Sequence, residues 1–386
     1  MAETNRSRLF AASCIALLLT AMTFAFRARL ETVFGPEGAG LTLEQIGYAF
    51  MPAFWGFTIA MVLGGPIVDF LGMRKGMIFA FILHLAGIVA TLFAVDFNSL
   101  FAATVLMGLG NGMVEAVCNP LVASSYPDQK VKMLNRFHLW WPAGIVTGSI
   151  LGVVVMDVMG LNWQVMVGLL FVPLIAYGYL FMGQEFPVTE RVEMGVSTGQ
   201  ALKTLVSPLY LFIGFCMMLS AATELGTTQR IESLLRETGV NALIVLAFIN
   251  GIMMIGRAYA GPIGERLSTS GMLWFSAIFS FIGLWLLASA SGYFVFVAAA
   301  VFAIGITFFW PTTLSFVSET MPQSGAFGLS IMGGLGMLSV SVILPIMGRV
   351  LDNAEGAEAI VKMSVLPAIL IVLYGALFFA RRGKAH

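Results

Sequence analysis

Charged side chains are scarce in this sequence. Only 10% of its 386 residues are charged and 59% are apolar, whereas soluble globular domains carry about 25% charged residues. The mean hydropathy is +0.93, and apolar runs near the ~20 residues that a bilayer-spanning helix needs recur along the chain. We therefore expect a protein embedded in a lipid bilayer. Because 20 basic residues are balanced by 20 acidic ones, the composition gives no reason to expect nucleic-acid binding.

Cysteine and histidine are also rare, with three of each. Cys14, Cys118 and Cys216 lie within apolar runs, and their odd number predicts free thiols. Three histidines and scattered acids form no metal-ligand pattern. The sequence contains neither an HExxH motif nor a phosphate-binding GxxxxGK[ST] motif. We therefore expect no metal, no cofactor, no direct coupling to ATP and no enzyme activity.

Charges, polar turns and Pro/Gly clusters divide the chain into twelve apolar segments. Open sheets cannot satisfy their backbone groups in lipid, so each segment is predicted to be a helix. The longest polar interruption predicts a bundle over 1–183, a cytoplasmic linker over 184–205 and a second bundle over 206–386. The predicted helices are 9–30, 46–68, 75–95, 99–124, 134–156, 162–183, 206–235, 241–264, 270–290, 293–319, 326–350 and 361–380.

Lysine and arginine concentrate on alternate connections between these helices. Arg6, Arg74 and Arg381 fall on the richer side, together with both ends of the chain. Cytoplasmic connections of membrane proteins carry the excess of basic residues. We therefore expect a multi-pass protein of the inner (plasma) membrane with both termini in the cytoplasm.

The two halves of the sequence resemble each other. The segment GGPIVDFLGMRKG (64–76) matches AGPIGERLSTSG (260–271), which aligns Asp69 with Glu265. Each segment follows the second predicted helix of its half. Two six-helix repeats in parallel order are typical of one class of transporter. The predicted fold is therefore an all-α membrane protein with twelve helices in two related bundles.

The segment GPIVDFLGMRK (65–75) resembles the loop between helices 2 and 3 of the major facilitator superfamily. This resemblance implies the superfamily's fold and a monomer. It also implies a cytoplasmic latch of charged residues that opens as the two halves rock. The candidate gating residues are Asp69, Arg74, Arg257, Glu265 and Arg266, and Glu319 is the expected partner of Arg257. The alternative is a plain turn whose basic residues only obey the topology rule.

A narrower resemblance covers GLGNGMVEAVCNP (108–120) and LNRFH (134–138). Both are similar to the fucose/proton symporter branch of the superfamily, in which an acid before an Asn-Pro pair handles protons and sugar. The resemblance nominates Glu115 and Asn119, with Asn135 and His138 as neighbours. The first-helix Asp that this branch uses for proton coupling is missing, and Arg27 lies near the matching depth. We assign proton coupling to Glu115 and Arg27.

Helical spacing supports a polar face around Glu115. Asn111, Glu115 and Asn119 are four residues apart and share one helix face, and a ladder of small residues from Gly108 to Ala116 lies beside it. A charge inside a membrane persists where it has a partner or lines a wet cavity. We predict that Glu115 faces such a cavity and binds solute hydroxyl groups. The alternative is a structural acid paired with Arg27.

The second half carries fewer candidates. Glu224 lies on a polar helix face, and Trp310 occupies the position opposite Glu115 in the repeat alignment. We predict that both contact solute, with Trp310 stacking on a sugar ring. The alternatives are an acid at a wet helix end and a tryptophan used for packing. For His138 two interpretations stay open: it relays a proton, or it forms a hydrogen bond at the helix end. His84 is expected to be a packing residue.

These features predict a secondary transporter that imports a small polar solute, a sugar, together with a proton. Two other functions stay open. One is export of hydrophobic compounds in exchange for protons, and the other is a receptor that senses a ligand without transporting it. The expected partners are the solute, the proton and the lipid bilayer.

Overall fold

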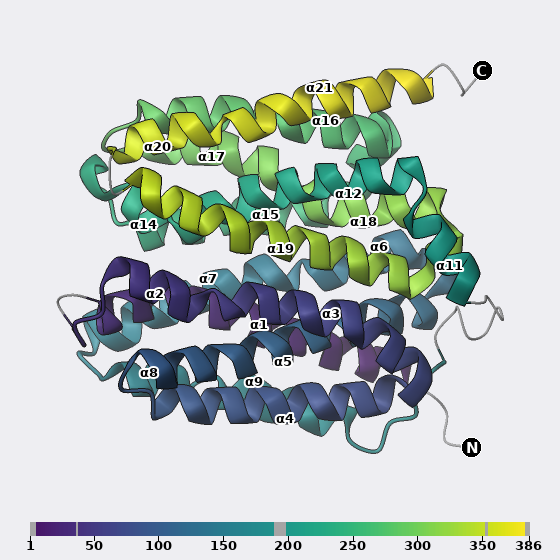
Figure 1. The fold of residues 1–386 in the computed structure, drawn as a ribbon, viewed down its shortest axis with the longest axis horizontal. Helices are drawn as coiled ribbons and strands as arrows, with labels where there is room; N and C mark the ends of the chain where they lie inside the picture. The colour runs from purple at the N-terminus through teal and green to yellow at the C-terminus, as the bar shows by residue number, and fades with distance from the viewer. Residues whose placement is uncertain (1–4, 36–37, 189–197, 352–353, 383–386) are drawn as a thin grey trace. The chain divides into compact units, whose positions relative to one another are not determined.

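The computed structural model describes residues 5–35, 38–188, 198–351 and 354–382. Every regular element within these ranges is a helix (Figure 1). The chain separates into two compact units. The first comprises residues 1–202 with 323–334, and the second comprises 203–322 with 335–386. The predicted linker boundaries at 183 and 206 stay a prediction.

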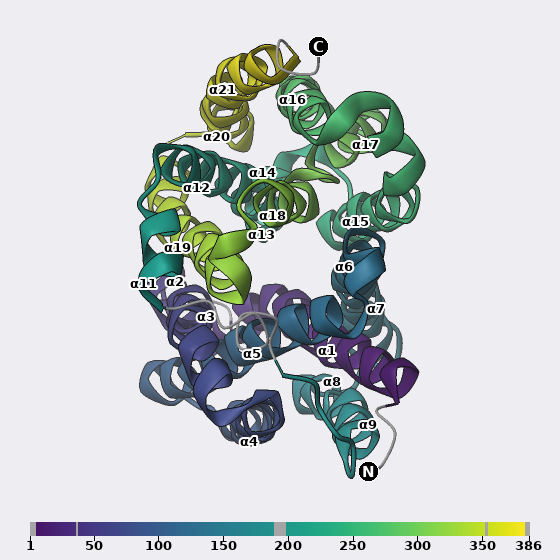
Figure 2. The same cartoon turned by 90° about the vertical axis from the view of Figure 1, so that its right-hand side faces the viewer.

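The first unit contains the helices of the N-terminal half. Its elements are α1 (Arg6–Phe34), α2 (Leu43–Phe50), α3 (Pro52–Leu71), α4 (Met73–Leu92), α5 (Phe97–Ser125), η1 (Pro127–Gln129), α6 (Lys130–His138), α7 (Trp140–Gly152), the π-helical η2 (Val153–Val158), α8 (Trp163–Gly168) and α9 (Phe171–Phe181). Helix α1 packs against α5, α7 and α9, while α5 also packs against α3 and α4 (Figure 2).

The second unit contains most of the remaining helices. Its elements are α12 (Pro208–Ala221), the π-helical η3 (Ala222–Gly226), α13 (Thr227–Gln229), α14 (Ile231–Leu234), η4 (Arg236–Thr238), α15 (Ala242–Ala258), α16 (Ala260–Ala288), α17 (Phe294–Ile306), α18 (Phe309–Thr320), α20 (Gly356–Met363) and α21 (Val365–Arg382). Helices α11 (Thr198–Leu205) and α19 (Gly325–Leu351), with η5 (Pro322–Ser324) before the latter, have residues in both units.

The apolar segments confirm the predicted all-helical membrane fold. In the described part of the chain, eleven helices are long and apolar enough to cross a bilayer, and α15 is a shorter apolar helix. The predicted helix 241–264 is shorter because the chain breaks at Tyr259, between α15 and α16. Helix α16 is itself interrupted at Ser268, where φ is 59°. Helix 206–235 is also broken, by the π turn η3 and again at Arg230.

Small residues let the helices of the first unit approach closely. A Cβ added to Gly112 would lie 2.3 Å from the Phe57 backbone oxygen of α3, and one added to Gly108 would lie 2.3 Å from the Pro52 oxygen. Gly144 of α7 meets α1 in the same way, with Ala21 Cβ at 2.6 Å. This confirms that the ladder from Gly108 packs against a neighbouring helix, as small residues do in membranes.

Candidate functional site

Glu115, Asn119 and His138 form one buried hydrogen-bonded group in the first unit. Asn119 Nδ2 donates to Glu115 Oε2 at 2.6 Å and to the Glu115 backbone oxygen at 3.0 Å. His138 Nε2 lies 3.0 Å from Asn119 Oδ1. An amide oxygen only accepts, so His138 carries a proton on Nε2. The three side chains are 2%, 5% and 3% exposed.

Local sequence explains this arrangement. Glu115 and Asn119 are four residues apart on α5, so their side chains meet on one face. Pro120 follows within the same helix and cannot donate a backbone hydrogen bond to the preceding turn. His138 is the last residue of α6, and α5 packs against α6. The structure thus brings together three residues that the symporter resemblance nominates.

Asn111 belongs to a different hydrogen-bonded chain. Its Oδ1 lies 2.9 Å from His84 Nε2 of α4, and its Nδ2 donates to Thr23 Oγ1 of α1 at 3.0 Å. His84 Nδ1 lies 3.1 Å from the Tyr177 hydroxyl of α9. Since Asn111 Oδ1 only accepts, His84 is protonated on Nε2 and accepts from Tyr177. The expectation that His84 is a satisfied packing residue is confirmed.

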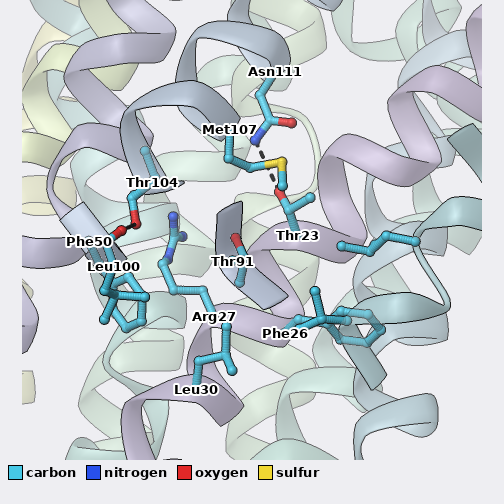
Figure 3. Close-up of a pocket in the computed structure, with 13 residues that line it drawn as sticks. Thr23, Phe26, Arg27, Leu30, Phe50, Thr91, Leu100, Thr104, Met107 and Asn111 are labelled. Atoms are coloured by element: carbon cyan, nitrogen blue, oxygen red, sulfur yellow. Dashed lines mark hydrogen bonds between the residues drawn. The ribbon is translucent and has the colours of Figure 1, made fainter. Parts of the chain in front are cut away.

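Asn111 also lines a cavity in the first unit, together with Arg27 (Figure 3). The cavity offers about 40 Å³ in which the centres of water molecules fit, and one water needs about 10–15 Å³ by this measure. Thr23 and Thr104 add hydroxyl groups to its wall. Arg27 is 8% exposed, with its guanidinium carbon 4.3 Å from the ring centre of Phe24. The cavity therefore has room for a few waters beside a buried cation.

Glu224 and Arg257 form a buried ion pair in the second unit. Arg257 Nη2 lies 3.4 Å from Glu224 Oε1, and Arg257 Nε donates to the Thr307 backbone oxygen at 2.9 Å. Both residues are 4% exposed. The expected partner Glu319 instead accepts a hydrogen bond from Thr269. The expectation that Arg257 pairs with Glu319 is therefore corrected: its carboxylate partner is Glu224.

The other predicted site residues differ in burial. Trp310 is 8% exposed, and its ring packs so closely on Gly336 of α19 that an added Cβ would lie 2.8 Å from it. Asn135 is half-buried, while Arg74 and Arg266 are exposed. The side chains of Asp69 and Glu265 are outside the described part of the structure. The charged latch thus stays a prediction.

Sequence reasoning missed several partners of these residues. Tyr177 and Thr23 complete the hydrogen bonds around His84 and Asn111, and Thr307 anchors Arg257. Tyr177 is 1% exposed, and a lone polar group inside an apolar helix is a usable signal, because buried polar groups need hydrogen-bond partners. The Thr307 contact uses a backbone oxygen, which the sequence does not mark.

Long apolar helices, close helix packing at small residues and buried charged groups define this protein as a multi-pass membrane protein. The sequence profile of one family matches residues 8–344. The chain belongs to the Major Facilitator Superfamily. This is a family of transporters, which agrees with the expectation that the chain is not an enzyme.

Known proteins of similar sequence and structure belong to the same family. The uncharacterised MFS-type transporter YttB of Bacillus subtilis (strain 168) is 21% identical over 402 residues, covering 96% of this chain and 95% of YttB. The E. coli fucose:proton symporter FucP matches with a TM-score of 0.73 and 17% identity, covering 95% of this chain and 97% of that chain. The proton:xylose symporter XylE matches with a TM-score of 0.78 and 14% identity, covering 97% and 96%. At these identities the solved structures establish a shared fold.

Proposed function

We propose that this transporter moves a small polyhydroxylated solute, a sugar, together with a proton across the inner membrane. The observation that carries the proposal is the buried carboxylate of Glu115, held by Asn119 at 2.6 Å. Two structural neighbours, FucP and XylE, are sugar symporters by name. Both support the choice of sugar over other solutes.

Carboxylate and amide groups suit the recognition of sugars. A carboxylate accepts hydrogen bonds from hydroxyl groups, and an amide can both donate and accept. Asn119 uses its donor on Glu115 and its acceptor on His138. A sugar hydroxyl that donates to Glu115 would replace or share the Asn119 contact. We therefore assign solute binding to Glu115 and Asn119, with His138 as a positioning residue that orients the Asn119 amide.

Protonation of Glu115 provides the coupling step of this proposal. Uptake of a proton by the carboxylate turns an acceptor-only group into a donor as well, and it removes a charge from a buried site. The hydrogen bonds offered to the solute then differ between the two protonation states. Arg27 adds a buried positive charge to the same unit, and we keep it as a coupling residue.

The remaining assignments follow the topology prediction. We propose that both termini lie in the cytoplasm and that the protein works as a monomer. Asn111, Asn135, Glu224 and Trp310 remain candidate solute-contacting residues. Their test is the loss of solute-induced stabilisation in alanine variants, because a ligand that binds the folded state raises its apparent stability.

The experiment begins with a thermal-shift screen of the purified protein against sugars and sugar acids. The stabilising solute is then used in vesicles with an imposed proton gradient. Glu115→Gln is expected to lose gradient-driven accumulation and to retain solute exchange, because its side chain cannot change charge. Glu358→Gln is the matched control, since that acid is exposed and forms an i,i+4 pair with Lys362 on the surface. Normal accumulation by Glu115→Gln would refute the assignment.

Two other functions are separated by the same vesicles. An exporter of hydrophobic compounds would release protons from the vesicle lumen as the compound moves in the opposite direction. A receptor would bind its ligand without any flux. If the vesicles take up protons together with an added sugar, the result supports symport and excludes both alternatives.

A further inference from the structure

Three helix irregularities meet around Arg257 in the second unit. The π-helical turn η3 carries Glu224, helix α15 ends one residue after Arg257, and helix α17 ends at Ile306 beside Thr307. Arg257 joins the end of α15 to the other two irregularities. Its Nη2 atom contacts Glu224 of η3, and its Nε atom donates to the backbone oxygen of Thr307 after α17. Single π-helical turns within α-helices often mark functional sites. Interrupted helices also form ion sites in many transporters.

Glu224 is incompletely satisfied in this arrangement. Its Oε2 atom is buried and has no hydrogen-bond partner among the described residues. Among the described residues, its Oε1 atom contacts Arg257 at 3.4 Å, which is longer than the 2.7–2.9 Å of a strong charge-assisted hydrogen bond. The hydroxyl of Thr227 in the next turn is also buried without a described partner. Buried polar atoms in this condition call for an explanation by a bound group or a change of state.

The surroundings of Glu224 offer few other groups that could titrate. Among the elements that pack on η3, α12 contains the buried Cys216 and α21 contains Tyr374, and Arg230 follows α13. The Tyr374 hydroxyl is bonded to Ser220, and Arg230 Nη2 lies 3.4 Å from the Leu344 oxygen of α19. From α15 the charged group is Arg257 itself. Helix α17 contains no ionisable residue, and Arg349 at the end of α19 is exposed.

We propose that Glu224 is a second proton-binding site and that its protonation releases Arg257. A proton from hydronium is transferred to Oε2: one O–H bond of hydronium breaks and leaves water, an O–H bond forms on the acid, and the carboxylate loses its charge. The ion pair with Arg257 becomes a weaker bond between a cation and a neutral acid, and Arg257 retains the Thr307 oxygen. The π turn and the end of α15 then become free to open. This inference deepens the proposed proton coupling and rests on it.

The test uses the proton itself as the probe and needs no solute. Backbone hydrogen exchange of the full-length protein in lipid nanodiscs is followed by mass spectrometry in acidic and alkaline buffer, after correction for the chemical effect of pH on exchange. Peptides covering 222–229 and 255–259 are expected to open about tenfold more in acidic buffer, equivalent to about 1.4 kcal/mol. Glu224→Gln mimics the protonated acid, so its peptides should exchange at the fast rate in both buffers.

Control variants make each outcome decisive. Glu358→Gln should respond to pH as the wild type does. Arg257→Gln, which removes the ion pair from the other side, should lose the pH response at 222–229, and it serves if Glu224→Gln fails to fold. A wild-type pH response in both Glu224→Gln and Arg257→Gln would overturn the proposal. It would also fail if sodium replacing potassium at constant pH reproduced the response in the wild type and not in Glu224→Gln, because the site would then bind a metal cation.

The outcome is distinguishable from that of the proposed function. A wild-type protein that shows no pH response in hydrogen exchange but normal Glu115-dependent accumulation would reject the second proton site alone. The opposite pattern would reject the sugar symport mechanism and leave a proton-sensitive pair in the second unit.

Discussion

The packing of α5 on α3 gives the sharpest stability prediction, because it holds the helix that carries Glu115. Gly112→Ala adds a single methyl group at a point of close contact between the two helices. That Cβ would lie 2.3 Å from the Phe57 backbone oxygen, and 2.8 Å from both the Phe57 Cα and the Ala60 Cβ. Favourable contacts between non-bonded heavy atoms lie at about 3.5–4.0 Å. The two helices would therefore have to separate by roughly 1 Å.

The expected cost follows from these distances. Overpacking by one methyl group costs about 1–3 kcal/mol, and a backbone oxygen cannot move away by changing a rotamer. We therefore take the upper end of this range, a packing cost of about 3 kcal/mol. The higher helix propensity of alanine over glycine offsets about 1 kcal/mol of it. Gly112→Ala should lower the free energy of unfolding by about 2 kcal/mol. Equilibrium unfolding in mixed detergent micelles measures this quantity.

Gly251→Ala is the matched control. Gly251 lies within α15, and a Cβ added there meets nothing within 4 Å. It should leave the protein unchanged or stabilise it by up to about 1 kcal/mol through helix propensity. Equal stability of the two variants would show that close packing at Gly112 does not determine how α3 and α5 fit together.

Two further predictions concern the first unit and the loop before α5. Asn111→Leu removes two hydrogen bonds, one to His84 and one to Thr23. Such bonds in membranes average about 0.6 kcal/mol each and reach about 1.7, so the variant should lower the free energy of unfolding in micelles by about 1–3 kcal/mol. An unchanged free energy of unfolding would contradict this prediction. Hydrogen bonds from the Ser99 hydroxyl and amide lower the pKa of Asp96. Its ionised form therefore stabilises the protein above the unfolded-state pKa, and this contribution disappears as the pH falls through the folded-state pKa. Asp96→Ala should lower the melting temperature at neutral pH and have little effect in acid, and a constant difference at every pH would refute the cap.

Periodicity predicted contacts within one helix better than contacts between helices. The four-residue spacing of Glu115 and Asn119 predicted their contact, and the small-residue ladder predicted a tight helix pair. The spacing could not tell that Asn111, on the same face, would bond to α4 and α1. A helix face is wide enough to meet several neighbours, and the rotation of each helix in its bundle is set by packing. Sequence spacing carries no information about that rotation.

The partner of Arg257 was missed for a related reason. Its expected place near the end of a straight helix favoured Glu319, but the chain breaks at Tyr259 and α15 ends beside the π turn of Glu224. Helix breaks change which residues lie at the same depth along the bundle. Neither of these two breaks has a proline at the break itself. An uninterrupted helix was therefore the simplest interpretation of an unbroken apolar run.

The two buried acids differ in what holds them, and this difference has consequences for function. The described contacts of Glu115 with Asn119 come from its own helix, four residues away. His138 of the neighbouring helix α6 holds the amide of Asn119 in turn. Glu224 depends on Arg257 from another helix, and Arg257 depends in turn on Thr307 from a third. A change of charge at Glu224 therefore acts on the relative positions of three elements, and a change of charge at Glu115 acts first on Asn119 and on the solute that we propose its carboxylate binds. Solute recognition accordingly fits the first acid, and control of helix movement fits the second.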